Sequence, residues 1–317
     1  MKAQAHDQDG LHRRKIPTGL TALGLLALSL TLAGCSIKRM AIDQVATALS
    51  ESGAGFASDD DPELIKAAAP FSLKLMESLL QEVPNHEGLL FATSSGFTQY
   101  AYAFVQLEAD QLEDEDFEGA QKMRDRARRL YLRARDYGLR GLEAGHRGFS
   151  GELFEAPENA VEVMTRGDVP LLYWTSVSWA AAISLSLDDA NMIADLPIVE
   201  SLIYKALELD PDYEDGAIHV FLISFEQARS AEGDPFERSR YHFERAMELQ
   251  KGRQIGALVA YAESVCVPKQ DRQNFQRLLN EALAFDAESH PEFRLVNLIM
   301  QERAAWLLSQ TDSLFLD

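Results

Sequence analysis

The sequence is poor in cysteine and in cationic side chains. It holds only two cysteines in 317 residues, too few for a disulfide scaffold or a thiolate zinc site. Thirty lysines and arginines stand against fifty acidic residues, which gives a formal net charge of −20. A surface this acidic repels phosphate backbones, and this excludes sequence-independent binding of nucleic acid. The apolar content of 46% is nevertheless that of an ordinary globular protein.

Familiar catalytic motifs are missing too. The chain lacks GxSxG, GxxxxGK, GxGxxG and HExxH, the patterns that present a nucleophile, cradle a phosphate or pair two zinc-binding histidines. No two of the five histidines beyond residue 34 lie within five residues of each other. We therefore predict a protein that is not an enzyme and has no cofactor or metal. A hydrolase with convergent groups is an alternative, and it requires perturbed carboxylates or histidines in a deep pocket.

The N-terminal region has the order of features found in an export signal. A cationic block at 13–15 precedes an uncharged stretch, 16–34, in which thirteen residues run from Leu20 to Leu32. That is the length of the apolar part of a signal peptide and is short for a membrane span. The stretch ends in Leu-Ala-Gly followed by Cys35, which resembles a bacterial lipobox. A short uncleaved anchor is the alternative.

Cleavage at the lipobox would make Cys35 the first residue of the mature protein. Several acyl chains of the palmitate type on this residue would hold the protein on a membrane. The protein would then lie on the periplasmic face of a bacterial membrane, and Ser36 after the cysteine favours the outer membrane. We expect three parts, namely a signal peptide at 1–34, a tether at 35–60 and a helical domain at 61–317.

Apolar residues in the mature chain recur at helical spacing. One stripe runs through Phe275–Leu283 at positions i, i+3, i+4, i+7 and i+8, and similar stripes begin at Phe97 and Val199. Alternating strand patterns of any length are absent from the sequence. The pairs Asp61-Pro62 and Asp234-Pro235 have the pattern of an N-cap followed by proline in the first helical turn. The sequence therefore predicts an all-α protein.

Similar helix endings recur along the chain. The segments Glu77–His86 and Tyr204–Tyr213 align without a gap, and the ending ALELDP resembles the second helix of a tetratricopeptide repeat. The corresponding apolar positions are 62, 65, 40 and 36 residues apart, at Leu80, Leu142, Leu207, Met247 and Leu283. A regular array would show about 34 residues. We expect one right-handed solenoid of helix pairs, built from irregular tetratricopeptide-like repeats around a single core.

Two blocks of opposite charge follow each other. Seven acidic residues occupy eleven positions in Glu108–Glu118, and seven arginines lie in Arg124–Arg140. On neighbouring antiparallel helices these blocks would pair in part and otherwise face solvent. A docking site is the alternative.

Aromatic side chains gather beside small residues in segments 96–106 and 172–179. Tyrosine and tryptophan combine apolar surface with a hydrogen-bonding group, and the concave helices of solenoids commonly form binding surfaces. The candidate residues for a ligand or partner surface are Tyr100, Tyr102, Tyr173, Trp174 and His219. Of these, His219 is also readily explained as a core histidine. The residues that we assign to the core are Phe97, Phe104, Trp179 and Cys266.

Several strings, taken together and in order, resemble one known family. They include GFTQYAYAFV from Gly96, RRLYLRARDYGL from Arg128, LYWT from Leu172 and DPDY from Asp210. In this order they are similar to the T component (TatT) family of TRAP transporters. The resemblance implies a periplasmic lipoprotein of repeat-type helical fold. Such proteins accompany the substrate-binding (P) component of a tripartite ATP-independent periplasmic transporter. Cys35, as the lipidated residue, is the one position whose role is transferred.

The leading hypothesis is a lipid-anchored, non-enzymatic component of a TRAP transporter. It would engage the periplasmic P component and an organic-acid or apolar ligand. An envelope-assembly scaffold unrelated to solute transport is the alternative, and it predicts an outer-membrane or cell-wall partner instead. Head-to-tail contacts between copies of the chain would also be compatible with a closed homo-oligomeric ring, such as a trimer.

Overall fold

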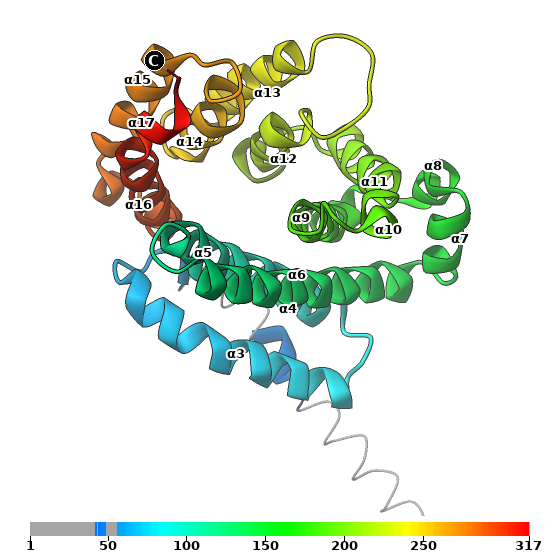
Figure 1. Cartoon of the computed structure of the whole chain (residues 1–317). Coiled ribbons are helices and arrows are strands. Elements are labelled where there is room, and N and C mark those ends of the chain that lie inside the picture. The colour runs from blue at the N-terminus through cyan, green and yellow to red at the C-terminus, as the bar shows by residue number, and fades with distance from the viewer. Residues whose placement is uncertain (1–41, 43, 49–55, 317) are drawn as a thin grey trace, which may run out of the picture.

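The computed structural model describes residues 42, 44–48 and 56–316 (Figure 1). Within these residues the protein is all-helical and contains no strand, as predicted. None of the described helices is both long and apolar enough to cross a membrane. The predicted signal peptide, Cys35 and most of the 35–60 tether lie outside the described residues.

Nine helices of 12 to 29 residues form the body of the described chain. They are α3 (Pro62–Glu82), α4 (Glu87–Ala101), α6 (Phe117–Gly145), α9 (Val169–Ser184), α11 (Leu196–Leu209), α12 (Tyr213–Phe225), α13 (Pro235–Gln250), α15 (Arg272–Leu283) and α16 (Arg294–Ser309). The shorter α-helices are α5 (Leu107–Leu112), α7 (Phe149–Glu155), α8 (Pro157–Ala160), α10 (Ala190–Ile193), α14 (Gly256–Tyr261) and α17 (Thr311–Leu314). Two π-helical turns follow α4 and α14 directly, η1 (Tyr102–Gln106) and η4 (Ala262–Cys266).

The two predicted aspartate caps are present. The side chain of Asp61 accepts a hydrogen bond of 3.0 Å from the backbone N–H of Leu64, and Pro62 begins α3. Asp234 caps α13 in the same way, with Pro235 at its first position. Each carboxylate satisfies an N–H that the helix itself leaves unpaired. The start of both helices is therefore encoded locally.

Helix α6 approaches α9 closely because glycines line the contact. A Cβ atom at Gly138 would lie only 2.1 Å from Oγ1 of Thr175, and one at Gly141 would lie 2.7 Å from Cδ2 of Leu171. Thr175 is fully buried and donates its hydroxyl hydrogen to the carbonyl of Leu171, at 2.6 Å. The buried hydroxyl is thus satisfied within its own helix, and the interface needs no further polar partner.

The end of the chain returns to its beginning (Figure 1). Helix α16 packs against α3, and one hydrophobic cluster contains residues of both. Nη1 of Arg303 on α16 lies 3.1 Å from Oδ2 of Asp110 on α5, and its Nη2 lies 2.5 Å from Oε1 of Glu263 on η4. Arg294 donates a hydrogen bond of 3.1 Å to the carbonyl of Ser58. The described helices therefore close into a ring.

The predicted core residues are confirmed. Phe97, Phe104, Trp179 and Cys266 are each at most 8% exposed. The five positions aligned in the repeats are less uniform, because Leu80 and Leu142 are buried whereas 39% of Leu283 is exposed.

The two charge blocks pair through one arginine. Arg124 on α6 donates hydrogen bonds to Glu113, at 2.6 Å, and to Asp110, at 3.3 Å. Arg133, on the same helix, lies instead 3.7 Å from Glu77 of α3. The expected pairing across the hairpin is thus correct for Arg124, while Arg133 connects α6 to α3.

Replacing Arg303 by methionine should destabilise the fold strongly. Methionine keeps apolar bulk but, among the described residues, leaves Glu263 without a cation and Asp110 with Arg124 alone, and only 6% of the Arg303 side chain is exposed. Breaking a buried ion pair costs about 3–5 kcal/mol. Because both carboxylates are partly exposed, we expect a loss at the lower end of this range, about 3 kcal/mol. The free energy of unfolding in urea measures the loss.

Arg272→Met is the matched control, because the ion pair of Arg272 with Asp312 on α17 is solvent-exposed. Its loss should be at most about 1 kcal/mol. Equal losses in the two variants would show that Arg303 does not hold the ring closed.

Candidate functional site

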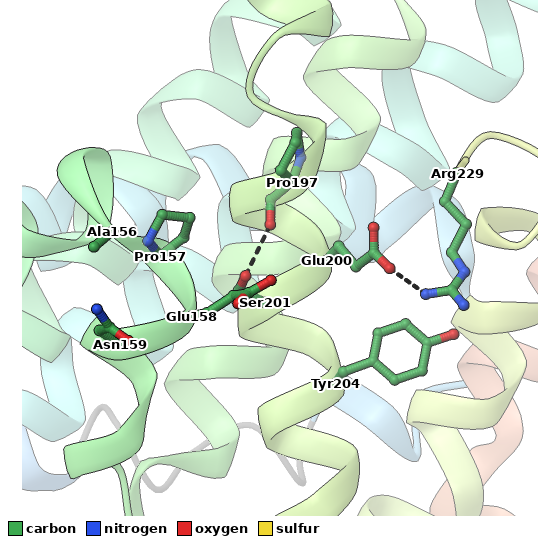
Figure 2. Close-up of a pocket in the computed structure, with 9 residues that line it drawn as sticks. All are labelled: Ala156, Pro157, Glu158, Asn159, Pro197, Glu200, Ser201, Tyr204 and Arg229. Carbon is green, nitrogen blue, oxygen red and sulfur yellow. Dashed lines mark hydrogen bonds and ion pairs between the residues drawn. The ribbon is translucent and has the colours of Figure 1, made fainter. Parts of the chain in front are cut away.

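A groove of about 520 Å³ opens between α8, α11 and the segment that follows α12 (Figure 2). Its walls combine apolar surface of Pro157, Pro197 and Tyr204 with the charges of Glu200 and Arg229. Arg229 reaches toward Glu200, with which it forms an ion pair, and its guanidinium carbon lies 4.5 Å from the centre of the Tyr204 ring. The other lining residues are Ala156, Glu158, Asn159 and Ser201.

Beneath the groove lies a buried carboxylate, Glu226, which is 1% exposed. It accepts a hydrogen bond of 2.9 Å from Nε of Arg229 and further hydrogen bonds from Arg238 and Tyr204. Burial alone would raise the pKa of Glu226. Hydrogen bonds from His242, Tyr204 and Arg238 and the charge of Arg229 outweigh burial and hold the pKa at about 2. Glu226 is therefore an ionised anchor for the groove wall.

His219, a predicted surface candidate, is buried beside His242. The two Nδ1 atoms are 2.8 Å apart, so one ring donates and the other accepts a single proton. Nε2 of His219 is buried and has no hydrogen-bond partner in the described part of the protein. Burial, followed by the proximity of His242, lowers the pKa of His219 to about 4. The ring is therefore neutral near pH 7 and occupies the core between α12 and α13.

Tyr173 and Trp174 lie together on α9 and meet the start of α12. The Tyr173 ring is centred 5.1 Å from that of Trp174 and 5.4 Å from that of Tyr213. We call these three residues the aromatic wall. Tyr173 is 9% exposed, and Trp174 and Tyr213 are half-buried. Two predicted residues thus come together, and Tyr213 joins them from another helix.

The side chains of Tyr100 and Tyr102 have different surroundings. Tyr100 is 8% exposed and accepts a hydrogen bond of 3.3 Å from Arg126. Tyr102 begins η1 and is 36% exposed. Burial raises its pKa first, and the charge of Glu263 raises it further, against the opposing effect of Arg303. The π-helical turns η1 and η4, which carry Tyr102 and Glu263, therefore both adjoin the junction that closes the ring. Such turns are frequent at functional sites.

The charged residues of the groove and of the aromatic wall were not predicted from local sequence patterns. Arg229, three residues after Glu226, is its one nearby partner, whereas Tyr204 and Arg238 lie 22 and 12 residues away, so the local pattern shows only an ordinary i,i+3 ion pair. Tyr213 and Glu214 could have been suspected, since the Glu-Asp-Gly segment that follows Tyr213 favours a turn.

The groove lacks the catalytic groups that the hydrolase hypothesis requires. Glu226 and His219 have strongly shifted pKa values, but neither lines the groove. Among the described residues, no three His, Cys, Asp or Glu side chains are arranged to hold a metal ion. The deep pocket with perturbed catalytic groups that this hypothesis requires is therefore not formed by the groove.

Comparison with known proteins gives the family. The model of a family described as "TRAP transporter T-component" matches residues 58–315, and the chain belongs to this family. An uncharacterized protein of Treponema pallidum (strain Nichols) is 31% identical over 310 residues, which cover 92% of this chain and 96% of the relative. Membership in the family implies association with TRAP transporters and a location in the bacterial envelope.

Replacing Glu226 by glutamine should lower the free energy of unfolding. It should also make this free energy less dependent on pH below pH 4.5. The native pKa of Glu226 is about 2, below its ordinary value of 4.5. The unfolded chain therefore takes up the proton first, and the stabilisation present above pH 4.5 is lost as the pH falls toward 2. The variant should lose about 3 kcal/mol at pH 7.

Denaturant unfolding at pH 7 and pH 3 measures the difference in free energy of unfolding between the wild-type protein and Glu226→Gln. This difference should be smaller at pH 3. Glu237→Gln on α13 is the control, because Glu237 is exposed and pairs only with exposed Arg240 among the described residues. If the stability difference between the wild-type protein and Glu226→Gln is the same at pH 3 as at pH 7, the low pKa of Glu226 is contradicted.

Proposed function

We propose that this protein is a lipid-anchored, non-enzymatic component of a TRAP transporter that engages the periplasmic P component. The observation that carries the proposal is the family match over residues 58–315. The lipobox supports an anchor on Cys35, which would hold the helical domain at the periplasmic face of a membrane. Ser36 favours the outer membrane.

In this proposal the groove of Figure 2 receives the P component. Its apolar walls and charged residues resemble the composition of transient protein interfaces, in which tyrosine and arginine carry much of the binding energy. Tyr204 and Arg229 are already held by Glu226 below the groove. Little side-chain freedom would therefore be lost when a partner binds.

Three finer features belong to the same proposal. The helix pairs are irregular tetratricopeptide-like repeats of a right-handed solenoid, whose curvature brings α16 back to α3. The surface for an organic-acid or apolar ligand is centred on Tyr102, the most exposed of the five predicted residues. Copies of the chain associate into a closed ring.

Affinity capture of the full lipidated chain from a crosslinked envelope tests the partner. Mass spectrometry should recover a periplasmic solute-binding protein together with the membrane subunits of the transporter. A Cys35→Ala chain should lose its membrane association. Recovery of outer-membrane assembly or cell-wall proteins without a binding protein would support the scaffold alternative instead.

Charge reversal at the groove tests the contact surface. Glu158→Arg changes an exposed lining residue and should weaken binding of the purified P component about tenfold, measured by calorimetry. Glu152→Arg on neighbouring α7 is the matched control, because Glu152 is equally exposed but does not line the groove. Equal effects of the two reversals would place the contact elsewhere.

A further inference from the structure

The aromatic wall has a carboxylate at its edge. The hydroxyl of Tyr213 donates a hydrogen bond of 3.1 Å to Oε1 of Glu214. Tyr173 and Tyr213 both feel the negative charge of Glu214, which raises the pKa of each phenol beyond the effect of burial. The three rings and the carboxylate therefore form one cluster, and none of these four residues lines the groove of Figure 2.

The carboxylate of Glu214 has no cationic partner. Its neighbours are paired, Asp212 with Arg245 at 2.9 Å and Asp215 with Arg253 at 2.7 Å. In the part of the chain that the structure describes, no Lys, Arg or His nitrogen lies within 4.0 Å of the Glu214 oxygens. A carboxylate that is partly withdrawn from water and lacks a positive charge is favourable only if a proton or a cation joins it.

Glu214 is open to solvent on one side and surrounded by protein on the others. Its side chain is exposed to solvent, yet burial raises its pKa, and together with the charge of Asp215 it outweighs the hydrogen bond from Tyr213, which lowers the pKa. These two observations agree if protein surrounds the carboxylate on several sides and leaves one side open. A small solute can therefore reach the carboxylate and the half-buried rings of Trp174 and Tyr213, behind which Tyr173 is buried.

The backbone holds Glu214 in an unfavourable conformation. Glu214, Asp215 and Gly216 have φ values of 41°, 55° and 89°, all in the left-handed region. Two consecutive residues with side chains rarely adopt it, and such strain concentrates at functional sites. The ion pair of Asp215 with Arg253 helps to hold this run. The conformation presents Glu214 beside the rings.

The Trp174 indole contributes an unused donor. Its Nε1 atom is buried and has no hydrogen-bond partner among the described residues. The indole lowers the pKa of the Tyr213 hydroxyl, so the two groups are neighbours, but their geometry is not that of a hydrogen bond. An unpaired N–H at this position suits an acceptor oxygen supplied by a ligand.

We propose that Tyr173, Trp174, Tyr213 and Glu214 bind the alkylated ammonium group of a small organic cation. Aromatic faces attract such groups through their quadrupoles and tolerate methyl substituents. Glu214 supplies the counter-charge that the protein leaves unpaired. An organic anion fits less well, because Glu214 would repel it and no cation stands close by. This assignment goes beyond the transporter association and does not depend on it.

Calorimetry of the purified full chain in detergent tests the proposal with three probes. Choline and tetramethylammonium should bind with a dissociation constant in the millimolar range or tighter. The neutral isostere 3,3-dimethyl-1-butanol has the shape of choline without the charge, and it should bind at least tenfold more weakly. If neither cation binds in this range, or if the neutral isostere binds equally well, the proposal is overturned.

Two substitutions locate the site. Glu214→Gln keeps a hydrogen-bond acceptor for Tyr213 but removes the charge, and it should weaken choline binding about tenfold without changing the binding of the neutral probe. Trp174→Phe keeps an aromatic face and should reduce choline binding less than Glu214→Gln does. Asp212→Asn is the matched control, since it removes an exposed charge two residues away that is already paired with Arg245.

Thermal unfolding verifies that each variant is folded. Choline binding that survives Glu214→Gln unchanged would overturn the assignment of these residues. The P component serves as an independent readout, because Glu214 lies outside the groove. Loss of choline binding with intact binding of the P component separates this site from the proposed transporter contact. Choline binding by the unaltered protein without any binding of the P component would refute the proposed contact alone.

Discussion

The pairing of Arg303 with Asp110 and Glu263 is the interaction on which the ring of helices depends. Arginine can serve two carboxylates at once because its guanidinium carries several donors in a fixed plane. The three residues come from α16, α5 and η4, so one side chain joins both ends of the described chain. Withdrawal of the guanidinium from water is tolerable only with these partners present. The ring brings the partners of Arg303 together, and the buried Arg303 in turn requires these partners.

Glu226 and Glu214 show how the surroundings decide the role of a residue type. Both are drawn into the protein near α12, and burial disfavours the charge of each. Two arginines, a tyrosine and a histidine compensate Glu226, which becomes part of the frame beneath the groove. Glu214 receives only a tyrosine hydroxyl in the described structure. A fully compensated carboxylate stabilises a fold, whereas an uncompensated one is available to a ligand.

The groove and the aromatic wall are separate surfaces, and their residues suit different kinds of partner. The groove is open and bordered by prolines, Tyr204 and Arg229, as suits a protein partner. The aromatic wall is smaller, and its strained neighbour Glu214 suits a small solute. Family membership concerns the transporter as a whole. The partners proposed for the two surfaces are finer assignments, and the cation site does not depend on the transporter. The two levels are therefore tested by different experiments.

Local sequence patterns were sufficient to predict the helices, two of their caps and much of the core. Asp61-Pro62 and Asp234-Pro235 act through neighbouring backbone groups, and the stripe from Phe275 follows from helical periodicity. Ordered strings along the whole chain were also enough to indicate the family. The closed ring, the Glu226 network and the aromatic wall were decided only by the tertiary structure. Arg303 lies 193 residues from Asp110, and Tyr213 lies 40 from Tyr173. Local pattern carries no information about such pairs, because packing alone brings them together.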